Sequence, residues 1–131
     1  MNAVHDNIPL LMRHLDKIAV RDVREAYLYL THHAASLRLY RCRAGEHGDV
    51  DDFRYEQGPE WPFAFIVNKH SLLWYFRKAG LRNPAAKIAE LQKYFSEVKE
   101  VQKGEITVRI NNIDDARLIT SLVFGAATSS A

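Results

Sequence analysis

The chain has 131 residues, of which 47% are hydrophobic and 26% charged, an ordinary composition for a globular protein. Its length is that of one typical domain, so a single hydrophobic core is expected. Cys42 is the only cysteine, which excludes an intrachain disulfide framework and a cysteine-based zinc site and favours a cytoplasmic location. The first residues lack a secretion signal, and no apolar run reaches the roughly 18 residues that cross a bilayer, so we expect no membrane association.

The first two predicted elements are helices. Asn7 can cap a helix with Pro9 in its first turn, and apolar residues recur every three or four positions as far as Ile18. The same spacing predicts a second helix over residues 20–34, although tyrosines near its end also favour a strand. The chain therefore opens with a helical pair.

A strand pattern follows. Residues 36–42 alternate, with Leu37 and Leu39 on one face, and the Gly- and Asp-rich segment 44–52 predicts a loop. A short strand is predicted over residues 52–56. Two further strands, 63–68 and 71–78, are joined by a tight turn and predict a hairpin.

The strand over residues 71–78 carries two rows of large side chains. Leu72, Trp74 and Phe76 point to one side, and Leu73, Tyr75 and Arg77 point to the other. We expect the Trp74 row to be core and Tyr75 and Arg77 to be partly exposed, on a face that a helix could cover or a ligand could use.

The last third of the chain predicts a helix, a strand and a helix. Asn83 and Pro84 resemble a helix start, and the apolar stripe continues to Glu97 and Val98. Residues 104–111 form the clearest strand pattern, with Ile106, Val108 and Ile110 facing the core and Arg109 facing away. Asn112 opens a final helix, which ends at Gly125.

The element order is therefore α-α-β-β-β-β-α-β-α. It predicts a single α+β domain over residues 1–125, with a mostly antiparallel sheet and with helices packed mainly on one face. Residues 126–131 are small and are expected to fray.

Charge is distributed unevenly along the chain, although the net charge is only +2. Between residues 46 and 60 there are six carboxylates against Arg54 alone, and between residues 69 and 99 there are seven bases against Glu90 and Glu97. If the acidic and basic segments touch, their charges neutralise each other and the case for nucleic-acid binding largely collapses.

Catalytic and metal-binding patterns are weak. The six histidines show no ligand spacing, and no nucleophile motif or phosphate-binding glycine loop occurs. Glu97 and Lys99 resemble half of a metal-dependent nuclease site but lack the preceding acidic ligand. We therefore expect no catalytic residue, metal or cofactor, and we keep a metal-dependent nuclease only as a third hypothesis.

The first functional hypothesis is a non-catalytic domain that binds nucleic acid. Sheet faces that carry aromatic rings for stacking and arginines for phosphate occur in proteins that bind single strands. The alternative is that these side chains have no ligand and are ordinary outward-facing residues of a half-covered sheet, in which Tyr and Arg shield apolar surface. The candidate contacts are Arg38, Tyr40, Arg41, Arg43, Tyr75, Arg77, Lys78 and Arg82.

The alternative hypothesis is a protein-interaction module, such as an inhibitor, an adaptor or an immunity-type partner. In that case the acidic segment 46–60 would meet a basic site on another protein, with electrostatic attraction setting the association rate. The candidate residues are Glu46, Asp49, Asp51 and Asp52.

Overall fold

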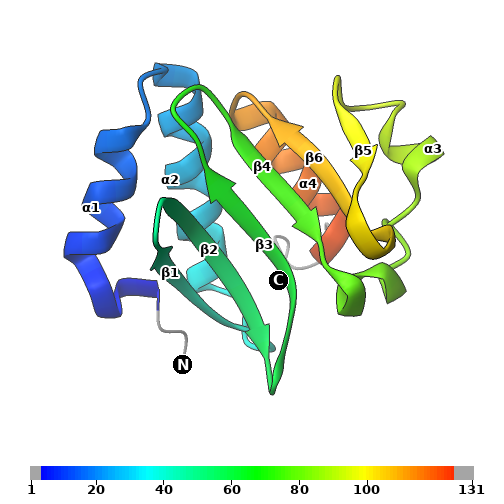
Figure 1. Ribbon diagram of the computed structural model, residues 1–131, viewed down its shortest axis with the longest axis horizontal. Coiled ribbons are helices and arrows are strands. Elements are labelled where there is room, and N and C mark those ends of the chain that lie inside the picture. Colours follow the sequence, from blue (N-terminus) through cyan, green and yellow to red (C-terminus); the bar gives the residue numbers. More distant parts are fainter. Residues whose placement is uncertain (1–3, 126–131) are drawn as a thin grey trace.

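A computed structural model describes residues 4–125, which form one six-stranded antiparallel sheet in the order β1-β2-β3-β4-β6-β5 (Figure 1). The helices are α1 (Ile8–Lys17), α2 (Arg21–Ala35), α3 (Ile88–Leu91) and α4 (Ile113–Phe124). The strands are β1 (Arg41–His47), β2 (Val50–Gln57), β3 (Glu60–Val67), β4 (Leu72–Phe76), β5 (Val98–Glu100) and β6 (Ile106–Ile110). Three short 3-10 turns are η1 (Val4–Asn7), η2 (Lys78–Arg82) and η3 (Gln102–Gly104). The predicted α+β class and element order are confirmed; the fraying predicted for residues 126–131 lies outside the described residues.

One aromatic layer joins the sheet to the helices. In the strand register, Phe65 lies opposite Trp74 and Trp74 lies opposite Val108, so these side chains share one face. Trp74 is completely buried, and its ring lies 5.2 Å from that of Tyr55 and 6.3 Å from that of Phe124 on α4, measured between centroids. The helix α2 adds Tyr27, whose ring meets Phe65 edge-on at 5.9 Å. The prediction that the Trp74 row is core is confirmed.

The second row of β4 lies on the opposite side of the sheet. Leu73, Tyr75 and Arg77 are all partly exposed, as predicted. The helices α2 and α4 lie behind the sheet and α1 lies beside its β1 edge, so none of the three covers this second face (Figure 1). We call it the open face. No helix in residues 4–125 is long and apolar enough to cross a membrane.

Two predictions about the first hairpin are wrong. The strand predicted over residues 36–42 begins only at Arg41, and Leu39 is 74% exposed in the preceding linker. The predicted loop over residues 44–52 is instead the end of β1 and the start of β2, with Gly48 and Asp49 as the turn. Asp and Gly favour turns locally, but pairing across the hairpin and ion pairs to the carboxylates stabilise the strands here.

The helix predicted from Asn83 to Glu97 is also wrong. Only Ile88–Leu91 is helical, and Val98 belongs to β5, which pairs with β6. Asn83 is not a helix cap; its side chain accepts a hydrogen bond from the Ala85 amide and donates one to the Val123 carbonyl, each at 2.9 Å. Edge pairing with β6 and this link to α4 outweigh the local helical preference.

A buried histidine connects the two N-terminal helices with the sheet. His14 on α1 is fully buried, with Nε2 3.0 Å from the Gly45 carbonyl of β1 and Nδ1 2.8 Å from the Tyr27 hydroxyl of α2. Because a carbonyl can only accept, Nε2 carries the proton and Nδ1 accepts from Tyr27. Burial lowers the pKa of His14 and Lys17 lowers it further, against the opposing effects of the Gly45 carbonyl, Asp51 and Asp52.

We therefore expect stability to fall in mild acid. The unfolded His14 titrates near 6.5, above its lowered native pKa, so its contribution is complete above about pH 6.5 and is lost as pH falls towards the native value. The loss cannot exceed about 1.4 kcal/mol per pH unit for one proton. Urea unfolding between pH 8 and pH 5 should show a weaker pH dependence for His14→Gln than for the parent. Equal pH dependence in both proteins would contradict this assignment.

A second prediction tests the central packing. Val108 is fully buried beside Trp74 and Val98. Val108→Asp should destabilise the fold by about 3–5 kcal/mol, because it buries a charge without a partner. Thermal unfolding of this variant, with Val101→Asp as a control at an exposed position beyond β5, measures the difference. A Val108→Asp protein that melts with the parent would show that the strand is wrongly placed.

Candidate binding surface on the open face

The strand register places side chains from neighbouring strands in rows across the open face. One row runs from Arg43 on β1 through Arg54, Ala64 and Tyr75 to Thr107 on β6. The next row contains Gly45, Asp52, Ile66, Leu73 and Arg109. Residues from five strands are thus neighbours on one surface.

Two arginines flank a tryptophan on this surface. The guanidinium carbon of Arg54 lies 3.9 Å from the centre of the Trp61 ring, and that of Arg77 lies 3.8 Å from it. Arg54 comes from β2 and Arg77 follows β4, so they approach Trp61 on β3 from its two sides. Cation–π attraction favours this stack, and each arginine also pairs with a carboxylate: Arg54 with Asp52 at 3.1 Å and Arg77 with Glu105 at 3.2 Å.

A hollow of about 300 Å³ adjoins the stack. Ala64 and Ile66 give it an apolar floor, and the short side chain of Ala64 leaves space between its larger neighbours. Tyr75, His47 and the stacked arginines supply its aromatic and polar walls. The full lining is His47, Val50, Asp52, Arg54, Trp61, Ala64, Ile66, Tyr75 and Arg77.

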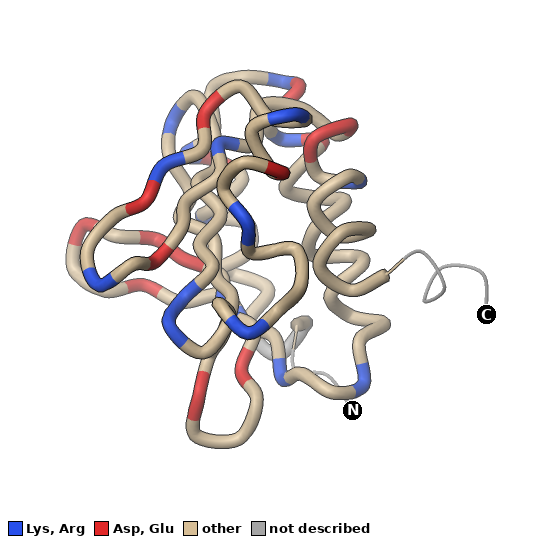
Figure 2. Tube along the Cα trace, turned by 90° about the vertical axis from the view of Figure 1, so that its right-hand side faces the viewer, with Lys and Arg blue, Asp and Glu red and all other residues tan. Residues whose placement is uncertain are grey.

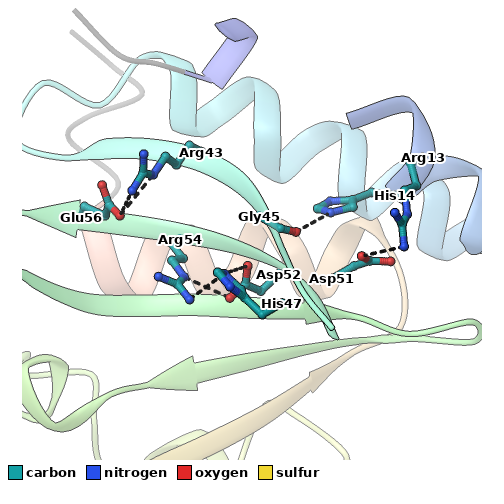
Figure 3. Close-up of polar contacts among 9 residues, drawn as sticks. All are labelled: Arg13, His14, Arg43, Gly45, His47, Asp51, Asp52, Arg54 and Glu56. Atoms are coloured by element: carbon teal, nitrogen blue, oxygen red, sulfur yellow. Dashed lines mark hydrogen bonds and ion pairs between the residues drawn. The ribbon is translucent and has the colours of Figure 1, made fainter. Parts of the chain in front are cut away.

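A network of polar groups orients Arg54 (Figure 3). Its Nε donates to Oδ2 of Asp52 at 3.1 Å, and its Nη2 donates to Nε2 of His47 at 2.7 Å. Asp52 is only 6% exposed and lies beside Gly45. A Cβ atom on Gly45 would approach Oδ1 of Asp52 to 2.5 Å, so the absence of a side chain there leaves room for the carboxylate.

The predicted nucleic-acid contacts are brought together only in part. Arg41, Arg43, Tyr75 and Arg77 lie on the open face. Arg38 and Tyr40 line a different hollow, of about 470 Å³, beside the end of α4. The Tyr40 ring packs on Phe124 at 5.4 Å, and burial raises the pKa of its hydroxyl.

The predicted basic residues differ in their ionic partners. Arg43 pairs with Glu56 at 3.0 Å, and Arg82 pairs with Glu60 at 3.0 Å. The acidic and basic segments therefore touch at Arg82, which counts against nucleic-acid binding through that residue. Figure 2 shows charges of both signs interspersed along the trace. Arg38, Arg41 and Lys78 have exposed side chains, and none of the three takes part in a side-chain ion pair within residues 4–125.

The predicted acidic residues are mostly engaged within the molecule. Asp51 is 3% exposed and pairs with Lys17 on α1 at 3.4 Å, and Arg13 on α1 pairs with Glu46. Asp52 belongs to the Arg54 network. Of these four carboxylates, only Asp49, at the exposed tip of the turn, forms no ion pair with another residue in the range 4–125.

Sequence reasoning missed Trp61, Arg54 and His47. Trp61 lies between two prolines, a context that predicts an interruption between strands and not a place within β3. The sequence pattern identifies Arg54 only as the single base of the acidic segment and His47 only as a histidine without metal-ligand spacing. A signal was nevertheless present, because Arg54 is the only base among six carboxylates and an unpaired base there would be unusual.

The residues that suggested a metal-dependent nuclease do not form a metal site in the part of the chain that the structure describes. Glu97 pairs with Arg109 at 3.1 Å, while Lys99 lies on β5. Among the described residues, no three His, Cys, Asp or Glu side chains are grouped so that they could hold a metal ion.

Comparison with known proteins returns no relative: no family model, no curated protein and no solved structure matches the chain.

The Gly45–Asp52 contact can be tested by substitution. Gly45→Ala should destabilise the protein by about 1–3 kcal/mol, because the added methyl group must displace a carboxylate held by Arg54. Combining it with Asp52→Ala removes the clashing atom, so the double variant should lose less stability than the sum of the two single changes. Additive losses in urea unfolding would contradict the contact.

Proposed function

We propose that this chain is a non-catalytic domain that binds single-stranded nucleic acid on its open face. The observation that carries the proposal is the Arg54–Trp61–Arg77 stack beside an apolar-floored hollow, on a sheet face that no described helix covers. Such a surface offers donors for phosphate and a site for a planar base within one compact area.

Phosphate contacts would come from guanidinium groups that retain unused donors. Arg77 reaches Glu105 through Nε, and Arg54 reaches Asp52 and His47 through Nε and Nη2. Within residues 4–125, neither the two Nη atoms of Arg77 nor Nη1 of Arg54 donate a side-chain hydrogen bond. Both guanidinium groups are held in place by the Trp61 ring, which lowers the entropy lost on binding.

Base contacts would form in the hollow. Two guanidinium groups already lie over Trp61, so a base would stack on Tyr75 or on an arginine plane and would cover Ala64 and Ile66. Unpaired bases can leave their neighbours and enter such a space, whereas bases in a duplex cannot do so without unpairing. This favours single strands over duplexes.

The internal ion pairs limit the expected strength of binding. Arg43 and Arg82 must exchange a carboxylate for a phosphate, which reduces the net gain from each. The alternative is that the acidic hairpin binds a basic protein partner. The hairpin has fewer free carboxylates for this than the sequence predicts, because Asp51 and Asp52 are buried and paired. Binding of a protein in place of nucleic acid remains an outcome of the test.

The test is a titration of fluorescein-labelled 12-nucleotide single-stranded DNA and RNA, and of a duplex of the same sequence, at two salt concentrations. The parent should bind single strands more tightly than duplex, with a linear loss of log affinity against log salt. The double variant Arg77→Ala, Lys78→Ala should lower the salt slope by about 0.7 for each phosphate that it no longer binds.

The matched control removes the same charge elsewhere. Arg21 and Arg24 are exposed on α2, and Arg21→Ala with Arg24→Ala should leave both affinity and salt slope near the parent values. Equal weakening by both double variants would place the binding surface elsewhere. No binding by the parent at low salt would overturn the proposal and would favour a protein partner.

A further inference from the structure

The contact between His47 and Arg54 determines the protonation state of the histidine. Nη2 of Arg54 lies 2.7 Å from Nε2 of His47. A guanidinium has no acceptor, so Nε2 must accept this hydrogen bond and cannot carry a proton. His47 is therefore neutral in this arrangement, with its proton on Nδ1.

The same histidine nitrogen lies next to an unsatisfied carboxylate oxygen. Nε2 of His47 is 3.5 Å from Oδ1 of Asp52, an atom that is buried and has no hydrogen-bond partner among the described residues. The neutral histidine cannot donate to it, because Nε2 carries no proton. A buried carboxylate oxygen without a donor is unfavourable. One additional proton, on Nε2 of His47, would give Oδ1 of Asp52 its missing donor.

We propose that protonation of His47 at Nε2 increases the affinity of the open face for nucleic acid, because it releases a hydrogen-bond donor of Arg54. The proposal rests on the proposed function, which it extends to the regulation of the same surface. When His47 gains a proton on Nε2, it can no longer accept from Arg54, and it can donate to Oδ1 of Asp52. Because two donors cannot remain 2.7 Å apart, the His47 ring must turn from Nη2 of Arg54 towards Oδ1 of Asp52. Arg54 keeps its Nε bond to Oδ2 of Asp52 and its place over Trp61, and its Nη2 becomes available to a phosphate.

The surrounding charges permit this exchange. From β2, Oδ1 of Asp52 lies 3.5 Å from Nε2 of His47 and can accept a hydrogen bond from it, while Nη2 of Arg54 lies 2.7 Å from the same nitrogen and can only donate to it. From β1, Arg43 lines the small hollow that His47 and Arg54 share, and Arg77, which follows β4, lines the larger hollow with His47. The His47 side chain is 50% exposed, so water can deliver a proton to it directly.

The consequence is stronger binding of a polyanion in mild acid. Protonation adds one positive charge and frees one guanidinium donor at the surface that faces the ligand. One additional phosphate contact on a single strand corresponds to about a fivefold gain at 0.1 M salt and to a salt slope steeper by about 0.7.

The ligand-free protein provides the first test. With ¹⁵N-labelled protein, the ring nitrogens of His47 and the Nη signals of Arg54 are followed by NMR between pH 8 and pH 5. At pH 8, Nε2 should have the chemical shift of an unprotonated nitrogen, and the Arg54 Nη signals should move together with the His47 titration. A proton on Nε2 at pH 8, or Arg54 signals that do not follow the titration, would overturn the proposal whether or not the protein binds nucleic acid.

The second test measures binding of the 12-nucleotide single-stranded DNA at pH 7.5 and pH 5.5. The parent should gain about fivefold in acid beyond the gain of His47→Gln, since glutamine can accept from Arg54 but does not titrate. His32→Gln is the control, because His32 is exposed on α2 and its loss should leave the acid gain intact. An equal acid gain in parent and His47→Gln would overturn the regulation; no binding by any variant at either pH would overturn the proposed function instead.

Discussion

The burial of Trp74 and its aromatic neighbours between the sheet and α2 and α4 is the interaction on which the rest of the structure depends. Rings from β2, β3, β4 and both helices meet around it, and several are completely buried. This packing is so complete that the Trp74 indole nitrogen and the Tyr55 hydroxyl find no hydrogen-bond partner among the described residues. The apolar area removed from water must outweigh that cost, and it holds the helices to one side of the sheet.

The open face follows from this arrangement. Because the helices cover one side, side chains that alternate with the core rows must form a stable surface of their own. They do so through ion pairs and cation–π stacking, with Trp61 shielded by Arg54 and Arg77 instead of by a helix. The same contacts that stabilise this surface also hold guanidinium groups in fixed positions. A structural role and a binding role are therefore compatible in the same residues.

The polar network around Arg54 on this face leaves one buried carboxylate oxygen without a hydrogen-bond donor among the described residues. Arg54 satisfies one oxygen of Asp52 and the Nε2 of His47, while the second oxygen of Asp52 lacks a donor among the described residues. Gly45 makes the arrangement possible, since a side chain there would occupy the position of the carboxylate. On the helix side of the same strands, Asp51 is paired with α1 and His14 is hydrogen-bonded through both nitrogens. Adjacent residues of one hairpin thus serve the core and the surface separately.

The sequence by itself determined the fold class, the element order and the two faces of the central strands. These features depend on local periodicity: alternation placed Trp74 in the core and left Tyr75 and Arg77 partly exposed, and the same rule identified Val108. What only the tertiary structure decided was the extent of elements that depend on distant partners. Residues 44–47 and 50–52 belong to strands because β1 and β2 pair across a hairpin. Residues 83–97 are mostly not helical because β5 pairs with β6 and the Asn83 side chain is hydrogen-bonded to α4. The stack of Arg54, Trp61 and Arg77 was likewise beyond sequence reasoning, because its members lie on or next to three neighbouring strands and Trp61 lies where the β2–β3 register shifts, so simple alternation does not place it on this face.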